Sequence, residues 1–483
     1  MKPAAIRRSR NFRPQRTSES GVTMVLMALA MVAILAMAAL SIDVVTLYLA
    51  NAEAQRSADT AALAAARVLS ISGMTGDPSN SPAGAINPWQ QACALATAVA
   101  KAVATQNTMG GAALITSQIS VTYPNNSDAT HCTVADAKFG VNPLVTVKVQ
   151  RTDLPTFFAR IWGRTAAAVS ATATAEAFNS SNSGNVGNTV TGSITPVQPR
   201  CVKPWIVPNQ DPGNDPTTCS GGVGSGGTCP PLVDNSDGSI PTSGIRVNNA
   251  GPGIIGRTFN LFADCKPGGG QCANPGNPAG QPKANPNGPG AGNPSSLQYV
   301  PGQLPASFTA VPSCAAGSDF QEAIAGCDQT TRYQCGNDAQ QSTIDLGQDN
   351  VPSDSALSAQ CLIGATDYGL GNGQDSLDPS SYPYKIKAGS ANPLGLSPNS
   401  LITSSNSIVS FPIYDSAGPP INGTGTSSVT IIGFLQVFIK SVNSDNSVNV
   451  TVLNVAGCGN GTNPTGPAVS GTSPVPVRLV TYP

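Results

Sequence analysis

Hydrophobic and polar positions change their pattern along the chain, and the first well-defined stretch is apolar throughout. Residues 22–40 contain no charged side chain, and the apolar run extends to residue 42. At a rise of 1.5 Å per residue, a helix of this length spans a bilayer core of about 30 Å. Residues 1–16 carry six basic side chains and no acidic one, so residues 1–21 are predicted to be a cytoplasmic basic tail. We therefore predict a single transmembrane helix at residues 22–42.

The helical pattern continues beyond the apolar run without a break. After residue 22 no Gly occurs before Gly73, and the stretch is rich in Ala, the strongest helix former. Ala58, Ala62 and Ala66 recur every four residues, which places small side chains on one face of the helix. We predict one helix that begins in lipid and ends as an amphipathic rod. Its small-residue face indicates packing against a globular head or partner helices, with a simple membrane stalk as the alternative.

Shorter helical and alternating patterns follow. Residues 89–106 form a second Ala-rich helical stretch. Apolar and polar side chains alternate in residues 115–123, 145–150 and 169–177, as they do in half-buried strands. The pattern predicts a small α/β unit, so that residues 43–178 make up an N-terminal α/β region.

The rest of the chain divides by composition. Residues 179–199 consist largely of Ser, Asn, Gly and Thr without apolar periodicity, which predicts a linker. Residues 200–483 are rich in Cys, Gly and Pro and are expected to form an extracytoplasmic, mostly β domain. Its β-type runs are residues 411–414, 429–440, 448–455 and 475–482. The predicted fold class is α+β: a long transmembrane and amphipathic helix with a small α/β unit, followed by a loop-rich, disulfide-stapled, mostly β domain.

The cysteines indicate the compartment. The chain has 12 cysteines and no C-x-x-C pair, which argues against zinc ribbons and thioredoxin-like sites. An even number dispersed among loop-type residues predicts disulfides in an oxidising compartment, with buried free thiols in a reducing cytosol as the alternative. Cys93 and Cys132 are able to pair with each other, but the sequence leaves the connectivity open. The expected disulfide cysteines are Cys93, Cys132, Cys201, Cys219, Cys229, Cys265, Cys272, Cys314, Cys327, Cys335, Cys361 and Cys458.

Charge and catalytic motifs restrict the function further. Charged residues make up 11% of the chain and the net charge is −1, which argues against a nucleic-acid partner. A single histidine, His131, argues against zinc hydrolases, whose sites need two or three imidazoles. Asp367, Asp375 and Asp378 flank a Gly-rich loop and are interpreted as solvated turn residues, with calcium binding as the alternative. We assign no catalytic residue, no metal site and no cofactor, and we expect the protein not to be an enzyme.

The helix beyond the apolar run carries a family resemblance. Asp43, Tyr48, Gln55 and Asp59, followed by an Ala-rich run, resemble the N-terminal segment of TadG-like (TadE/TadG-like) proteins of Flp (tight adherence) pilus assembly. The chain departs from that family at three positions, which are Val45, Ala54 and Thr60. The resemblance is close over residues 16–70.

A second segment of the chain is similar to the same family. The sequence LPTFFARIW at residues 154–162 precedes Gly163 and a run of alternating Ala and Thr. TadE- and TadG-like proteins often close their N-terminal unit in this way. By analogy, the resemblance implies a pilin-like plan, in which a long helix packs on a small antiparallel sheet.

The resemblance implies a non-enzymatic component of Flp pilus assembly, anchored in the bacterial inner membrane by a single span. Its N-terminus would be cytoplasmic and its bulk periplasmic, where it would contact other proteins of the pilus or secretion machinery. Asp43 at the end of the apolar run is interpreted as an interfacial residue, with a functional group inside the membrane as the alternative.

Other interpretations of the N-terminus and of the function stay open. The segment Ala36-Met37-Ala38 resembles a signal-peptidase site, and cleavage there would release a surface-exposed or secreted disulfide-rich adhesin. A prepilin-peptidase cut after Gly21 is a further alternative, although Leu26 stands where related pseudopilins carry Glu. An extracytoplasmic enzyme that uses paired carboxylates is a third function class.

Overall fold

The structure is a computed structural model of the whole chain. It describes residues 20–73, 75–76, 88–134, 136–180, 197–212, 231–233, 254–263, 282, 284–285, 295–302, 304, 308–315, 317–327, 333, 342–345, 352–365, 373–378, 383–417, 421, 426–458 and 469–481. Several sequence predictions lie outside these residues: most of the basic tail, most of the linker, and the residues Cys219, Cys229, Cys265, Cys272, Cys335 and Asp367.

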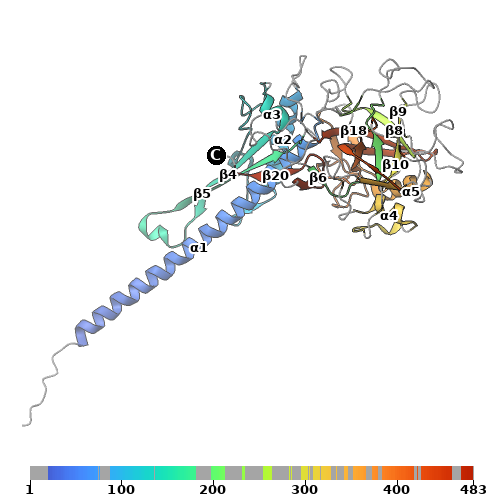
Figure 1. Cartoon of the computed structure of the whole chain (residues 1–483). Helices are drawn as coiled ribbons and strands as arrows, with labels where there is room; N and C mark the ends of the chain where they lie inside the picture. Colours follow the sequence, from blue (N-terminus) through green and yellow to red (C-terminus); the bar gives the residue numbers. More distant parts are fainter. Residues whose placement is uncertain are drawn as a thin grey trace, which may run out of the picture.

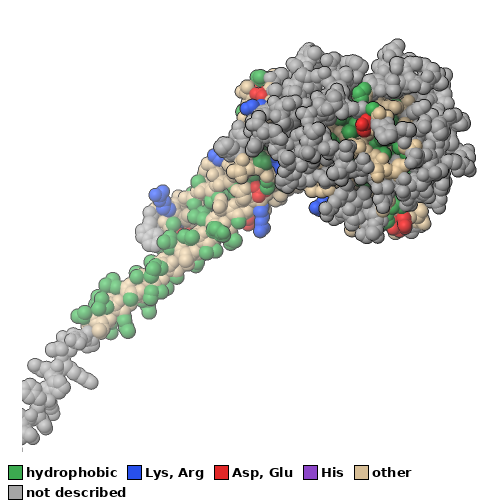
Figure 2. Space-filling model, in the orientation of Figure 1, with side chains coloured by type: hydrophobic (Ala, Val, Ile, Leu, Met, Phe, Trp, Pro, Cys, Tyr) green, Lys and Arg blue, Asp and Glu red, His purple; other side chains and the backbone are tan. Residues whose placement is uncertain are grey.

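One long helix dominates the molecule. Helix α1 (Ser20–Ser70) has 51 residues and is unbroken from the apolar run into the Ala-rich stretch. It is the one helix of the described residues that is long and apolar enough to cross a membrane. None of its most apolar stretch is buried in the rest of the protein. Figure 1 shows that the first half of α1 projects from the rest of the molecule, whereas the second half is embedded in it. The apolar side chains of the projecting half are exposed (Figure 2).

The second half of α1 packs against a small sheet and a second helix. These elements are α2 (Pro88–Thr105), β3 (Ile119–Thr122), β4 (Leu144–Pro155), β5 (Ala166–Ala177) and β20 (Val477–Val480). The strands form an antiparallel sheet in the order β20-β5-β4-β3. The short elements α3 (Ala137–Val141), η1 (Thr116–Gln118), η2 (Ala159–Trp162), β1 (Thr108–Met109) and β2 (Ala112–Ala113) complete this unit.

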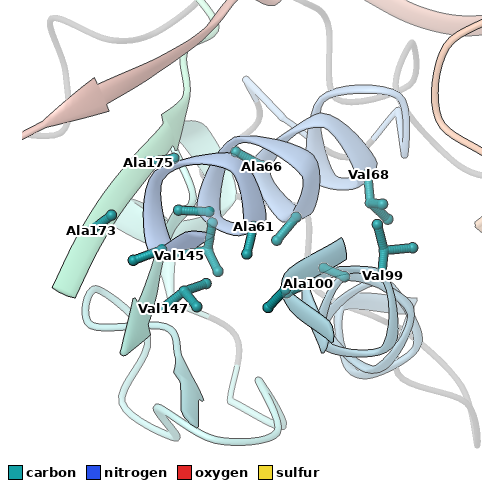
Figure 3. Packing of buried hydrophobic residues seen from close by; sticks show 14 of the residues in the cluster. Ala61, Ala66, Val68, Val99, Ala100, Val145, Val147, Ala173 and Ala175 are labelled. Atoms are coloured by element: carbon teal, nitrogen blue, oxygen red, sulfur yellow. The ribbon is translucent and has the colours of Figure 1, made fainter. Parts of the chain in front are cut away.

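Small side chains explain the close packing of α1. Ala61 and Ala66 are fully buried in one hydrophobic cluster with Val145 and Val147 of β4 and Ala100 of α2 (Figure 3). Alanine carries no side chain beyond Cβ, so the helix backbone approaches both the sheet and α2 without leaving room for larger groups. The alternating Ala of β5 face α1 in the same cluster. The small-residue face predicted from the sequence is therefore a packing face within this chain.

Six strands between residues 205 and 457 build a closed barrel. Its described strands are β7 (Trp205–Pro208), β8 (Thr258–Ala263), β10 (Ser296–Pro301), β15 (Ile408–Tyr414), β17 (Ile431–Val442) and β18 (Val448–Gly457). Their order is β7-β15-β17-β18-β8-β10, and a β7–β10 pairing closes the ring. The pairs β7–β15 and β8–β10 are parallel and the others antiparallel. Apolar side chains from all six strands fill the interior, as expected for a small barrel.

Shorter elements surround the barrel. They are α4 (Asp319–Ala325), α5 (Pro352–Ile363), η4 (Ser313–Ala315), β6 (Val197–Pro199), β9 (Ala284–Asn285), β11 (Ser342–Asp345), β12 (Ser376–Asp378), β13 (Lys385–Lys387), β14 (Leu401–Ile402), β16 (Thr426–Val429) and β19 (Val469–Gly471). The disulfides Cys201–Cys327 and Cys314–Cys361 link segments that are far apart in sequence. The predicted α+β class, with a long N-terminal apolar helix and a disulfide-containing β region, is confirmed. The last described strand, β20, returns to the sheet beside α1, a pairing that the sequence pattern did not reveal.

The end of α1 is bonded directly to the barrel. The side-chain amide of Asn454 in β18 donates to the carbonyl oxygen of Ser70 at 2.6 Å. The amide of Asn179, just after β5, donates to Val455 O at 3.3 Å, and the Ser180 hydroxyl donates to Gly457 O at 2.6 Å. Ile71 packs in one cluster with residues of β17 and β18. The helix and the barrel therefore meet through buried hydrogen bonds and apolar contacts rather than through a free linker.

Gly73 is required at this junction, which gives a first prediction. Its φ is +74°, and an added Cβ would lie 2.4 Å from Ile255 Cγ2 and 2.5 Å from Leu453 O. Gly73→Ala should lower the free energy of unfolding by more than about 1–2 kcal/mol, because the clash adds to the cost of a left-handed conformation. Gly395→Ala is the matched control, since φ is +63° with nothing within 4 Å of the new Cβ. Equal losses for both variants in urea unfolding would show that the junction tolerates a side chain.

Candidate functional site

The part of the chain that the structure describes holds no group of three or more His, Cys, Asp or Glu side chains placed to bind a metal ion. The candidate functional site is instead structural. It lies where α1 leaves the predicted membrane span and meets the connection between β4 and β5.

Asp43 is the central residue of this site. It follows the apolar run on α1, yet its side chain is only 3% exposed. Its Oδ1 accepts a hydrogen bond from the backbone N–H of Phe157 at 2.9 Å, and its Oδ2 accepts from those of Phe158 and Ala159 at 3.0 and 2.6 Å. Ala159 is the first residue of the short helix η2 and Phe157 and Phe158 directly precede it, so their N–H groups have no partner within the helix. Asp43 therefore caps a helix that is more than a hundred residues away in sequence and holds the β4–β5 hairpin against α1.

The surroundings of Asp43 favour its ionised form. Desolvation raises the pKa of the carboxyl group, but the N–H donors of Ala159, Phe157 and Phe158 together lower it further, so that the pKa lies below its ordinary value of 3.8. A carboxyl group whose pKa is lower in the folded than in the unfolded chain stabilises the fold above the unfolded value. This contribution is lost as the pH falls through the folded pKa, so the contact between hairpin and helix should persist at neutral pH and weaken only below the ordinary carboxyl pKa of 3.8.

Removal of the Asp43 carboxylate gives a second prediction. In Asp43→Ala, the amides of residues 157–159 lose their acceptor and should exchange hydrogen with solvent at least about tenfold faster. Asp43→Asn keeps one acceptor oxygen and should give an intermediate rate. Hydrogen exchange read by mass spectrometry on the detergent-solubilised chain measures both. Unchanged protection of residues 157–159 in Asp43→Ala would contradict the assigned contact.

The other residues of the family signature have different environments. Tyr48 is 74% exposed. The Gln55 amide donates to Asp59 Oδ1 at 2.7 Å and lies 3.5 Å from Thr172 O of β5. Thus Asp43 and Gln55 face the β4–β5 hairpin, Asp59 supports Gln55, and Tyr48 belongs to the outer surface of α1.

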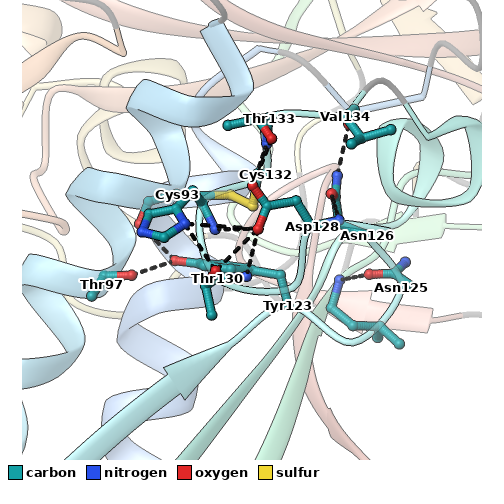
Figure 4. Close-up of a disulfide and its surroundings, with 12 residues drawn as sticks. Cys93, Thr97, Tyr123, Asn125, Asn126, Asp128, Thr130, Cys132, Thr133 and Val134 are labelled. Atoms are coloured by element: carbon teal, nitrogen blue, oxygen red, sulfur yellow. Dashed lines mark hydrogen bonds and ion pairs between the residues drawn. A yellow bond between two sulfur atoms is a disulfide. The ribbon is translucent and has the colours of Figure 1, made fainter.

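A disulfide fixes the other end of this unit. Cys93 of α2 and Cys132 form a bond that ties α2 to the loop after β3 (Figure 4). The Tyr123 hydroxyl donates to Cys93 O at 2.6 Å. Asp128 organises the loop by accepting from the side chains of Thr133 and Thr130, and these bonds hold the pKa of its carboxyl group below the usual range. His131 is exposed beside them. The hydrogen bonds of Asp128 hold the loop in its conformation next to the disulfide.

The aspartates considered for calcium have other partners. The interpretation of Asp375 as a solvated turn residue is wrong, because its side chain is buried. It accepts hydrogen bonds from Gly389 N and Asn392 Nδ2, both within 3 Å, and from the Ser405 hydroxyl. Asp378 forms an ion pair with Lys387 at 3.0 Å. These donors and this cation occupy the carboxylate oxygens that a calcium ion would need.

The remaining expected cysteine is also bonded. Cys458, directly after β18, is disulfide-bonded. None of the cysteines in the described ranges is a free thiol. Three disulfides between described residues are typical of a protein in an oxidising compartment.

One sequence comparison matched part of the chain. Residues 21–68 match the Tad family model, which is described as Flp pilus-assembly TadE/G-like. The resemblance predicted from Asp43, Tyr48, Gln55 and Asp59 is thereby confirmed. Neither a comparison with curated proteins nor one with solved structures found a match. The matched segment is α1 itself, from the start of the apolar run to the end of the packed Ala-rich face.

Proposed function

We propose that this chain is a non-enzymatic component of Flp pilus assembly, anchored in the bacterial inner membrane by residues 22–42. Residues 1–21 would be cytoplasmic, and the barrel would project into the periplasm to contact other proteins of the pilus or secretion machinery. The observation that carries the proposal is the continuity of α1. The helix that matches the family model also runs from an exposed apolar segment into the hydrophobic core that it shares with α2 and the four-stranded sheet.

The exposed apolar segment supports a membrane anchor. Large apolar side chains of α1, such as Met24, Met27 and Leu35, are more than half exposed. Each would cost about 1.5–3 kcal/mol to keep in water rather than in an apolar environment. A bilayer removes this cost for the whole segment at once. The disulfides support placement of the head on the oxidising side of the membrane.

The geometry supports a mechanical role for the helix. Residues 43–70 of α1 rise roughly 40 Å above the end of the predicted span. The sheet, α2 and the Cys93–Cys132 disulfide stiffen this part, and the bonds of Asn454 and Asn179 fix the barrel to its end. The chain would therefore hold its head at a set height and orientation, where partner proteins of the assembly could bind.

A complementation experiment gives the third prediction and tests this role. Deletion of the gene should abolish or strongly reduce Flp-type pili, and the full chain should restore them. A matched variant, in which a cleavable signal peptide replaces residues 1–42, would deliver the same head to the periplasm without its anchor. This variant should fail to restore piliation although it accumulates. Restoration by the free head, or normal piliation in the deletion strain, would contradict the anchored role.

A further inference from the structure

The tip of the β4–β5 hairpin lies at the level where α1 leaves the predicted membrane span. This tip consists of residues 156–165, which include η2. The three hydrogen bonds to Asp43 fix its height, because Asp43 is the first residue after residues 22–42. Figure 1 shows the hairpin running down along α1 away from the head and ending beside the helix. The tip is thus the part of the folded unit nearest to the bilayer.

The exposed side chains of the tip have a composition typical of a membrane interface. Phe157 is 60% exposed and Ile161 is 75% exposed, although both are large and apolar. Arg160 and Arg164 are exposed beside them, and residues 156–165 contain no acidic side chain. Apolar side chains that enter the acyl boundary and arginines that reach lipid phosphates are a combination favoured at the headgroup level.

The neighbouring surface of α1 continues the same pattern. Val44, Val45, Tyr48 and Leu49 are all more than half exposed, directly beyond the span. Leu49 lies roughly 9 Å above Asp43 along the helix axis. Headgroup regions add roughly 5–8 Å on each side of the hydrocarbon core, so these side chains fall within or at the edge of that layer. An aromatic ring such as that of Tyr48 is enriched at this depth.

We propose that the hairpin tip is a second membrane contact, which docks on the leaflet facing the head. Phe157 and Ile161 enter the boundary between headgroups and acyl chains, and Arg160 and Arg164 bind lipid phosphates. This inference rests on the proposed membrane anchor. Two contacts, one through α1 and one through the tip, restrict the tilt of the helix and thereby set the direction in which the head points.

Photo-crosslinking in vesicles tests this contact. The full chain carries p-benzoylphenylalanine at position 157 or, in a second variant, at position 161, and is reconstituted in phosphatidylcholine vesicles with or without phosphatidylglycerol. Position 32 within the apolar run is the positive control, and exposed Leu394 on the head is the negative control. We expect lipid adducts at positions 32, 157 and 161 and none at position 394.

The outcomes separate the tip contact from the anchor. Adducts at position 32 but at neither tip position would overturn the tip contact and leave the anchor intact. No adduct at position 32 would overturn the anchor and, with it, the proposed function. If position 157 crosslinks in whole cells to a protein rather than to lipid, the proposed lipid contact is wrong and the tip binds a partner protein. In phosphatidylglycerol vesicles, Arg164→Gln should lower the adduct yield at position 157 by roughly fivefold, the contribution of one arginine at an anionic surface.

Discussion

Loss of the Cys93–Cys132 disulfide should lower the free energy of unfolding of the N-terminal unit by about 4 kcal/mol. The bond joins residues 39 apart in sequence, and both cysteines are buried in the main cluster of this unit. Opening it frees a long loop in the unfolded chain, and the entropy gained there is the source of the loss. The variant Cys93→Ala/Cys132→Ala removes the bond without leaving a thiol that could pair elsewhere.

Hydrogen exchange under increasing urea measures this effect on α2 and β3 separately from the barrel. The matched control is Cys314→Ala/Cys361→Ala, which opens a loop of similar length, 47 residues, in the head. The control should destabilise α5 and leave the protection of α2 unchanged. If α2 keeps its full protection in the Cys93→Ala/Cys132→Ala variant, the disulfide does not stabilise the unit that holds α1.

The second large effect is expected from overpacking the small-residue face of α1. Ala61→Leu adds three carbon atoms where the helix lies between β4 and α2, close to Val147 and Ala100 (Figure 3). Because the site is fully buried, the added atoms must displace the sheet or α2. Overpacking of this kind typically costs about 1–3 kcal/mol, and we expect a loss of that size.

An exposed alanine of the same helix supplies the control for this substitution. Ala52→Leu makes the same chemical change on the outer face of α1 and should alter the unfolding free energy by only a few tenths of a kcal/mol. Urea unfolding of the solubilised chain compares the two variants. Equal stabilities of Ala61→Leu and Ala52→Leu would mean that the small-residue face is not tightly packed, and the rigid connection between membrane and head would lose its basis.

The periodicity of apolar and polar residues was sufficient to predict the helices and strands whose pattern lies within one short segment of the chain. The unbroken run without Gly or Pro predicts α1, and the alternating residues 145–150 and 169–177 lie within β4 and β5. The Ala spacing also identified the buried face of α1, because only small side chains recur there. These features depend on residues that are close in sequence, and so the sequence alone reveals them.

Long-range partners could not be read from the same patterns. The barrel contains parallel pairs such as β7–β15, whose strands are about two hundred residues apart, and no side-chain pattern specifies such a pairing. The contacts of Asp43 could not be predicted for a similar reason, because its partners are backbone N–H groups, which carry no side-chain signal. Gly163, whose left-handed φ of +80° ends η2, marks the end of this short helix but does not point to Asp43.

The helix α1 is expected to stay intact and to join the membrane to the head. Mass spectrometry of the chain extracted from alkali-washed membranes tests this directly, because trypsin should release residues 17–56 as one peptide that covers the entire span. We predict this uncut peptide in the membrane fraction. A soluble product whose first peptide begins at residue 39 would contradict the prediction, since the head would then be free of the membrane.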